Sequence, residues 1–143
     1  MNKRSPTKSF SARIAAHVVD ELEAQSARLG LSKSQLGERL LEEGLQMDQF
    51  PGVIFRSGPA GRRAGLAGGP DVWEVVRDLK GAAAARVADP VSQVSDVSGI
   101  PRAKIELALS YYAAHPDDVD ERIRLADEAV ERVQRALDVA HRA

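Results

Sequence analysis

The residue types that most often carry catalysis or bind metals are few and scattered in this sequence. The three histidines, His17, His115 and His141, fall in different segments, and their spacing suggests no shared metal ion. Neither an HExxH motif nor a nucleophile elbow is present, and the acidic pair Asp117-Asp118 falls on an expected helix, where solvated charge is normal. The chain has no cysteine, which excludes thiolate nucleophiles, thiolate zinc sites and disulfides and fits a reducing compartment. We therefore expect no enzyme, no cofactor and no metal, which leaves recognition of other molecules as the chemistry to explain.

The charge is balanced overall but uneven along the chain. The 143 residues contain 20 Lys and Arg against 21 Asp and Glu. Residues 1–13 carry four basic residues and no acid, residues 51–88 carry six basic against three acidic residues, and residues 89–143 carry seven basic against eleven acidic residues. A basic arm and an acidic tail suggest two partners of opposite sign, although a merely solubilising arm would have the same composition.

Length and hydropathy limit the class of protein. A chain of 143 residues forms one ordinary domain or two very small ones. No apolar run approaches the ~20 residues that a membrane span needs. No apolar stretch follows the basic start, as a secretory signal would require. We therefore expect a soluble cytoplasmic protein with no membrane partner.

Residues 1–48 read as a strand, a helix, a tight turn and a second helix. Apolar and polar side chains alternate over residues 8–14, which is the period of a strand, and the spacing becomes helical after Ala16 until Gly30. Ser32 is a good N-cap for the second helix, whose apolar positions are Leu36, Leu40, Leu41 and Leu45. So small a unit cannot bury enough surface alone, and a lone strand has two unpaired edges. Pairing residues 8–14 of two copies as an antiparallel ribbon removes both problems, so we predict a homodimer.

The same residues carry a family resemblance. The segment Ser9-Phe10-Ser11-Ala12-Arg13-Ile14, followed by Gly30-Leu31-Ser32-Lys33-Ser34, resembles the ribbon-helix-helix repressors and antitoxins of bacteria. In that family the ribbon enters the major groove of operator DNA. The resemblance implies that the Lys8–Ile14 segment meets DNA, with Ser9, Ser11 and Arg13 on base edges. It also implies that the backbone N–H groups of Ser32, Lys33 and Ser34 hold a phosphate, with the charge of Lys33 added. Ala15 departs from a frequent proline of the family and Gly37 weakens the second helix, and a plain helical hairpin is the alternative.

Residues 50–116 are expected to form a second module that begins with a hairpin. Phe50-Pro51-Gly52 ends the preceding helix, and the Pro and Gly residues near Ser57–Gly61 predict the turn. Arg62-Arg63 could cradle a phosphate, but no lysine-serine/threonine signature completes a nucleotide loop. We therefore interpret them as two solvated arginines beside a turn.

The rest of this module reads as helices. Gly69-Pro70-Asp71 opens a helix in which Trp73 is expected to anchor the core, since base stacking would need further aromatic residues nearby. Asp89-Pro90 caps a short helix with Val91, Val94 and Val97, and Ser98-Gly99 turns into a longer helix from Pro101. Two helices joined by a glycine turn resemble a helix-turn-helix, with Arg102 and Lys104 at the start of the second helix. Such cores often bind no DNA, so contact with DNA stays open.

A second resemblance spans residues 50–123. It rests on Pro51-Gly52, Gly61-Arg62-Arg63, Gly69-Pro70-Asp71-Val72-Trp73-Glu74-Val75 and Tyr111-Tyr112-Ala113-Ala114-His115-Pro116. These motifs are similar to those of the domain-of-unknown-function family four-three-three, small helix-turn-helix proteins often found as antitoxins beside PIN-like ribonuclease toxins. The toxin partner is implied by this resemblance.

Residues 117–143 contain no Gly or Pro and predict a long helix. Its apolar residues follow a heptad seam, formed by Val119, Ile123, Ala126, Val130, Val133, Leu137 and Ala140. This seam must pack on its own domain, on a second copy or on a partner. One interpretation is a helix laid in a groove of a basic toxin, steered by its acidic positions, with Val119, Ile123, Ala126, Val130, Val133 and Leu137 as the contact residues.

Together these patterns predict a mainly α fold with a short intermolecular β-ribbon: a ribbon-helix-helix dimer (residues 1–48), a small β-hairpin and helix-turn-helix-like module (residues 50–116) and a long C-terminal helix (residues 117–143). We expect an antitoxin of a type II pair that represses its operon, binds a PIN-like ribonuclease toxin and forms higher hetero-oligomers with it. The alternatives are a free-standing transcriptional regulator and a structural or segregation protein that assembles through the heptad.

Overall fold

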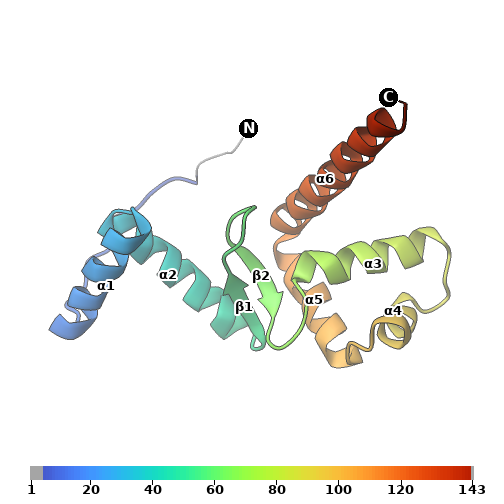
Figure 1. Cartoon of the computed structure of the whole chain (residues 1–143). Helices are drawn as coiled ribbons and strands as arrows, with labels where there is room; N and C mark the ends of the chain where they lie inside the picture. The colour runs from blue at the N-terminus through green and yellow to red at the C-terminus, as the bar shows by residue number, and fades with distance from the viewer. Residues whose placement is uncertain (1–4, 143) are drawn as a thin grey trace. The chain divides into compact units, whose positions relative to one another are not determined.

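The computed structural model describes residues 5–142, which form a mainly helical chain with a two-stranded antiparallel sheet (Figure 1). In chain order the elements are α1 (Ala16–Leu29), α2 (Lys33–Gln49), β1 (Val53–Arg56), β2 (Arg63–Leu66), α3 (Val72–Ala84), α4 (Pro90–Ser98), α5 (Arg102–Ala114) and α6 (Pro116–Arg142). The predicted class, mainly helical with a small hairpin, is confirmed.

The described residues divide into two compact units, and the division falls between Glu42 and Glu43, inside α2. We refer to them as unit one and unit two. The boundary predicted after residue 48 falls in the same helix. Residues 117–142, predicted as a segment of their own, belong to unit two.

The turn between α1 and α2 follows from two short sequence signals. Gly30 ends α1 in the left-handed conformation, with φ of 65°, and the N–H of Leu31 bonds to the carbonyl of Ser26 at 3.0 Å. Ser32 then caps α2 as predicted, because its hydroxyl accepts a hydrogen bond from the N–H of Gln35 at 3.0 Å. The Gln35 side chain accepts in return from the N–H of Ser32 at 2.9 Å, which completes a capping box.

Unit one has very little core in the single chain. Among residues 5–42, only Ser26 and Leu36 are buried, and Leu36 is 0% exposed. Three of the four predicted apolar positions of α2 are open to solvent instead of packed: Leu40 and Leu41 in this unit, and Leu45 beyond its boundary. The exposed large apolar side chains of this unit are Phe10, Ile14, Val18, Leu29, Leu40 and Leu41. A unit built in this way leaves most of its apolar face uncovered.

Unit two has a continuous core built on the hairpin and the helices after it. β1 and β2 pair antiparallel from Val53 opposite Leu66 to Arg56 opposite Arg63, as the turn residues predicted. Helix α3 packs against β2, α4, α5 and α6. Trp73 packs against this core, as expected, and is half-buried at its edge with the Arg77 guanidinium 5.1 Å from its ring centre. The buried apolar residues are Val53, Leu66, Val72, Val75, Val76, Leu79, Val94, Ile105, Ala108, Tyr111 and Val119.

The paired helices α4 and α5 form as predicted. Asp89 caps α4, accepting a hydrogen bond from the N–H of Ser92 at 3.1 Å, and Gly99 turns the chain with φ of 74°. Val94 is buried, whereas Val97 is exposed.

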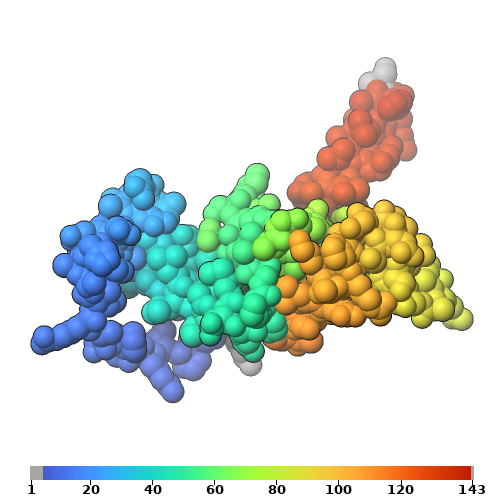
Figure 2. All heavy atoms as spheres, turned by 90° about the horizontal axis from the view of Figure 1, so that it is seen from below, coloured from blue at the N-terminus to red at the C-terminus, as the bar shows by residue number. Residues whose placement is uncertain are grey.

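Only the first part of α6 packs within unit two. Val119 is buried and Ile123 packs against the core, whereas Val130, Val133 and Leu137 are exposed. In Figure 2 the last part of α6, drawn in red, projects from the packed part of the same unit. Within the described residues, no helix combines the length and apolar character needed to cross a membrane.

Candidate nucleic-acid and partner interfaces

The segment predicted to meet DNA is fully open in the single chain. Residues 5–15, which we call the arm, contain neither helix nor strand, and all are exposed. Within the described part of the chain, nothing forms a hydrogen bond or ion pair with Lys8, Ser9, Ser11 or Arg13. A strand that pairs only with a second copy leaves no ladder in one chain, so the ribbon stays a prediction. Lys3 and Arg4 of the predicted basic arm lie outside the described residues.

The first turn of α2 presents backbone donors, as a phosphate site requires. The N–H groups of Lys33 and Ser34 have no acceptor among the described residues, because helical bonding begins further along. The Lys33 ammonium, however, lies 2.9 Å from a carboxylate oxygen of Glu23 on α1, and both side chains are half-exposed. Such a surface pair holds the side chain only weakly. A phosphate here would therefore compete with Glu23 for Lys33.

One residue of this turn escaped the sequence reasoning. Gln35 orders the start of α2 by accepting from the Ser32 N–H, yet we predicted only the Ser32 cap. The signal was present as Ser32 followed three residues later by Gln35, the spacing of a capping box. The pair orients the N–H groups of Lys33 and Ser34 without using them.

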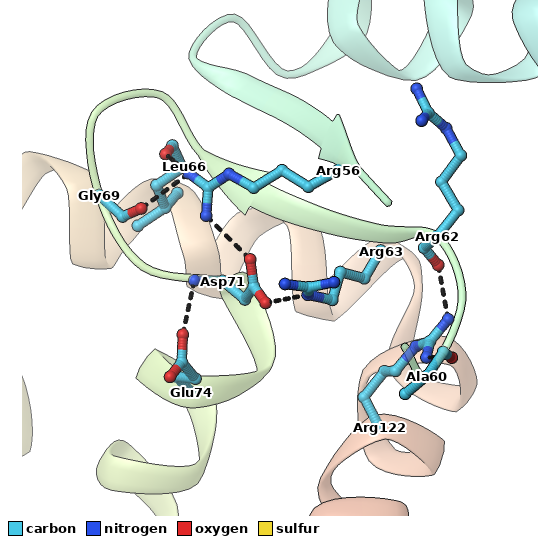
Figure 3. A network of polar contacts seen from close by, with 9 residues as sticks. All are labelled: Arg56, Ala60, Arg62, Arg63, Leu66, Gly69, Asp71, Glu74 and Arg122. Atoms are coloured by element: carbon cyan, nitrogen blue, oxygen red, sulfur yellow. Dashed lines mark hydrogen bonds and ion pairs between the residues drawn. The ribbon is translucent and has the colours of Figure 1, made fainter. Parts of the chain in front are cut away.

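The arginines of the hairpin have structural roles, which corrects the prediction of two solvated arginines. Arg63 pairs with the carboxylate of Asp71, and Arg56 binds its other oxygen at 2.9 Å (Figure 3). Arg56 also donates to the carbonyls of Leu66 and Gly69, at 2.5 and 2.7 Å. Asp71 is 5% exposed, so the two guanidinium groups compensate a buried charge. Neither arginine is available to hold a phosphate backbone.

Arg62 is likewise engaged. Its guanidinium pairs with Glu43 of α2, with Nε 2.7 Å from Oε2, and donates to the hydroxyl of Ser57 at 3.0 Å. Arg122 of α6 donates to the carbonyls of Ala60 and Arg62, the second at 2.5 Å, and so holds the hairpin loop (Figure 3). These bonds join the hairpin to helices far along the sequence, which no local pattern reveals.

The start of α5, where a helix-turn-helix would meet DNA, is also internally satisfied. Arg102 lies 3.4 Å from Asp89 and 3.0 Å from Glu106, and these carboxylates raise the pKa of Arg102. Hydrogen bonds from Ser92, and then from Arg102, lower the pKa of Asp89. Lys104 donates to the carbonyl of Ala67 at 2.8 Å. A surface that mixes these acids with its cations attracts a phosphate backbone weakly.

Polar contacts at the base of α6 hold it against α3 and α5. The Lys80 ammonium lies 2.6 Å from Asp120 and 5.0 Å from the ring centre of Tyr112, whose hydroxyl donates to Asp120 at 2.9 Å. The hydrogen bond from Lys80, followed by that from Tyr112, lowers the pKa of Asp120. The same pairing with Asp120, helped by Tyr112, raises the pKa of Lys80.

The predicted partner seam on α6 is therefore split in two. Val119 and Ile123 face their own unit, so they are not an open contact surface. We call the remainder, from Ala126 to Ala140, the outer seam; its exposed large residues are Val130, Val133 and Leu137.

Unit two also has a groove between α3 and α4 with a volume of about 430 Å³. Its apolar lining includes Ala82, Ala85, Val94 and the exposed Val97. Among the described residues, no group of His, Asp or Glu side chains could hold a metal ion.

Comparison with family models, curated proteins and solved structures found no match for the chain.

Proposed function

We propose that this chain is the antitoxin of a type II toxin–antitoxin pair, a cytoplasmic homodimer that represses its own operon and masks a PIN-like ribonuclease toxin. The DNA-binding part rests on unit one. The toxin-binding part rests on the resemblance of residues 50–123 to antitoxins found beside such toxins.

The observation that carries the DNA-binding part is the imbalance between the exposed and buried apolar groups of unit one. Leu36 is fully buried, whereas Phe10, Ile14 and Leu41 are exposed. Apolar groups of this number on so small a unit favour association, because covering them removes area from water at about 25 cal/mol per Å². A second copy whose arm pairs with this one would cover them.

In that dimer the polar side of the ribbon carries the recognition. Ser9, Ser11 and Arg13 alternate with Phe10, Ala12 and Ile14, so a strand that turns its apolar residues inward turns these three outward. Arg13 suits bidentate contact with guanine, and a serine hydroxyl is an adaptable, weakly selective partner. Lys33 and Ser34 at the start of α2 would fix the register on phosphates.

The test replaces Ser9, Ser11 and Arg13 by alanine and measures binding to the DNA upstream of the chain's own gene. We expect specific affinity to fall by about tenfold or more, because each good bidentate base contact contributes about 1–3 kcal/mol. Arg28→Ala removes an exposed arginine at the end of α1 and serves as the charge-matched control. Unchanged affinity of the triple variant would exclude the ribbon readout.

Masking of the toxin requires no chemistry from this chain. A protein laid over an acidic ribonuclease site excludes RNA and metal-bound water, and a toxin that joins two dimers would raise operator affinity through avidity. The α3–α4 groove is an apolar surface of unit two that such a partner could cover. Co-expression with the neighbouring open reading frame tests this part: we expect that frame to be toxic alone, harmless with this chain and co-purified with it.

The second candidate is a free-standing ribbon-helix-helix regulator. It shares the evidence of unit one and differs only in having no toxin. A neighbouring frame that is harmless alone and does not co-purify would favour it. A structural or segregation protein assembled through the heptad predicts instead that higher oligomers survive the loss of residues 1–13.

A further inference from the structure

We propose that the outer seam of α6 is a self-association site that pairs with the same seam of a second copy. This contact lies in unit two and is separate from the ribbon pairing of unit one. It concerns how the chain assembles and does not depend on the proposed DNA contacts.

The first support is that the outer seam continues a seam already in use. Val119 and Ile123 pack into the core of unit two, and Val130, Val133 and Leu137 follow on the same side of one uninterrupted helix. The repeat is a heptad, and the narrow apolar stripe of a heptad suits a single partner helix. The exposed apolar side chains of the outer seam therefore form a stripe that a second helix can cover.

The second support is the charge of the exposed part of the helix. The acidic excess of the C-terminal region lies before residue 124, in the part that packs. From residue 124 to residue 142 the charges balance, with four arginines against four acids: Arg124, Arg132, Arg135 and Arg142, and Asp127, Glu128, Glu131 and Asp138. This balance removes the reason to expect a basic partner, since there is no net acidity to steer one.

The third support is where those charges lie. Arg124 bridges Glu121 and Glu128 on its own helix, with an oxygen of Glu121 2.5 Å from Nη2, and Arg135 lies 3.8 Å from Glu131. These residues occupy the outer side of the helix, away from the seam. The positions beside the seam are Asp127, Gln134 and His141 on one flank and Ala129 and Ala136 on the other. Charged groups on a partner would find few counterparts there, whereas a second copy brings the same small and weakly charged flanks.

The fourth support is the size of the side chains. The medium-sized apolar side chains Val130, Val133 and Leu137 fill successive heptad positions of the outer seam, as packing against a second helix requires. Small residues, Ala126 and Ala140, lie at the two ends of the outer seam and let a second backbone come close. Two heptads are marginal alone, so the pairing would gain from any other contact that holds two copies together.

The test uses the absence of cysteine from the sequence. A single cysteine at Val133 marks the middle of the outer seam and faces its own copy whether two helices run parallel in register or antiparallel about their centre. Val139→Cys is the matched control, because Val139 is exposed on the same helix (69% against 60% for Val133) but lies off the seam. Mild oxidation of the full-length protein should link V133C into dimers about tenfold more than V139C, since a disulfide needs Cβ atoms about 3.5–4.5 Å apart.

A second measurement is needed because oxidation can also link two copies that meet only transiently. Val133→Glu buries a like charge in any self-paired seam, so we expect its sedimentation to show a smaller assembly than wild type, with Val139→Glu unchanged. Val133 is exposed, so the fold of unit two should survive, which circular dichroism checks.

The outcomes separate this inference from the proposed function. Equal cross-linking of V133C and V139C, or equal assembly of V133E and V139E, would overturn self-pairing through α6 while leaving ribbon pairing and DNA binding untouched. A V133E chain that keeps its assembly but loses the co-expressed toxin would assign the seam to the toxin. Loss of operator binding in the ribbon variant with intact V133C cross-linking would refute the DNA readout alone.

Discussion

Unit one and unit two differ in how far they bury their apolar side chains. Unit two buries eleven apolar residues from the hairpin, α3, α4, α5 and α6 in one cluster. Unit one, over residues 5–42, buries only Leu36 among its apolar side chains. The difference is that unit two covers its apolar side chains within one chain, whereas unit one leaves most of its own exposed.

The polar groups follow the same division. In unit two the arginines of the hairpin pair with buried carboxylates, and Arg56 also donates to loop carbonyls. In unit one Lys8 and Arg13 of the arm are exposed. Cations that pair with buried carboxylates inside a fold are a poor indicator of a nucleic-acid site. Exposed cations beside an exposed apolar face are a better indicator.

The largest effect that sharpens this contrast is expected at Asp71. Asp71→Ala removes the carboxylate shared by Arg56 and Arg63 and also the cap of α3. Breaking a buried pair costs about 3–5 kcal/mol, because the remaining charges are left uncompensated. The free energy of unfolding of unit two, measured by denaturant titration, should fall by that amount. Asp78→Ala, an exposed acid of the same helix, is the control, and an equal shift in both variants would contradict the role given to Asp71.

A smaller effect on total stability, confined to unit one, is expected at Leu36. Leu36→Ala should cost about 2–5 kcal/mol, the usual range for a buried leucine, and amide exchange should report it in α1 and α2 but not in α3 to α5. Leu41→Ala, at an exposed position of the same helix, should leave the isolated chain's fold unchanged and weaken association instead. If dilution of wild type leaves the protection of α1 and α2 unchanged, unit one is self-sufficient and the contrast between the units fails.

The cap of α2 should contribute about 1 kcal/mol. Ser32→Ala removes the acceptor for the Gln35 N–H and leaves the first turn of α2 less ordered. Thermal unfolding measures the loss, and Ser34→Ala, an exposed serine in the same first turn, is the comparison. Should the two variants melt together, the capping box has no energetic role.

The smallest effect is the pH dependence of the contact between Lys80 and Asp120. The pKa of Asp120 is lowered in the folded chain from its ordinary 3.8, so its contribution is present above that pH and is lost as the pH falls through the depressed pKa. The pKa of Lys80 is raised from 10.5, so the same contribution is lost again as the pH rises through the raised pKa. Both side chains are about half-exposed, so the effect is well under about 1 kcal/mol. Asp120→Asn should remove the acid limb, as unfolding between pH 2 and 5 would show, and an unaltered acid limb would assign it to other carboxylates.

Local signals in the sequence determined where the helices and strands begin and end. Gly30, Ser32, Pro51-Gly52 and Gly99 act within a few residues, because they set backbone angles or satisfy N–H groups of the nearest turn. For that reason the helix hairpin, the β-hairpin and the α4–α5 pair were predictable.

Only the tertiary structure decided which apolar faces are covered by a neighbouring element and which charged side chains form ion pairs. Arg62 and Arg63 read as solvated because their partners, Glu43 and Asp71, lie outside the window of a local pattern. The heptad of α6 is uniform in sequence, yet it is divided into a packed part and an outer part by where the other helices of unit two end. Periodicity states which side of a helix is apolar, but long-range packing determines how far along that side a neighbour reaches.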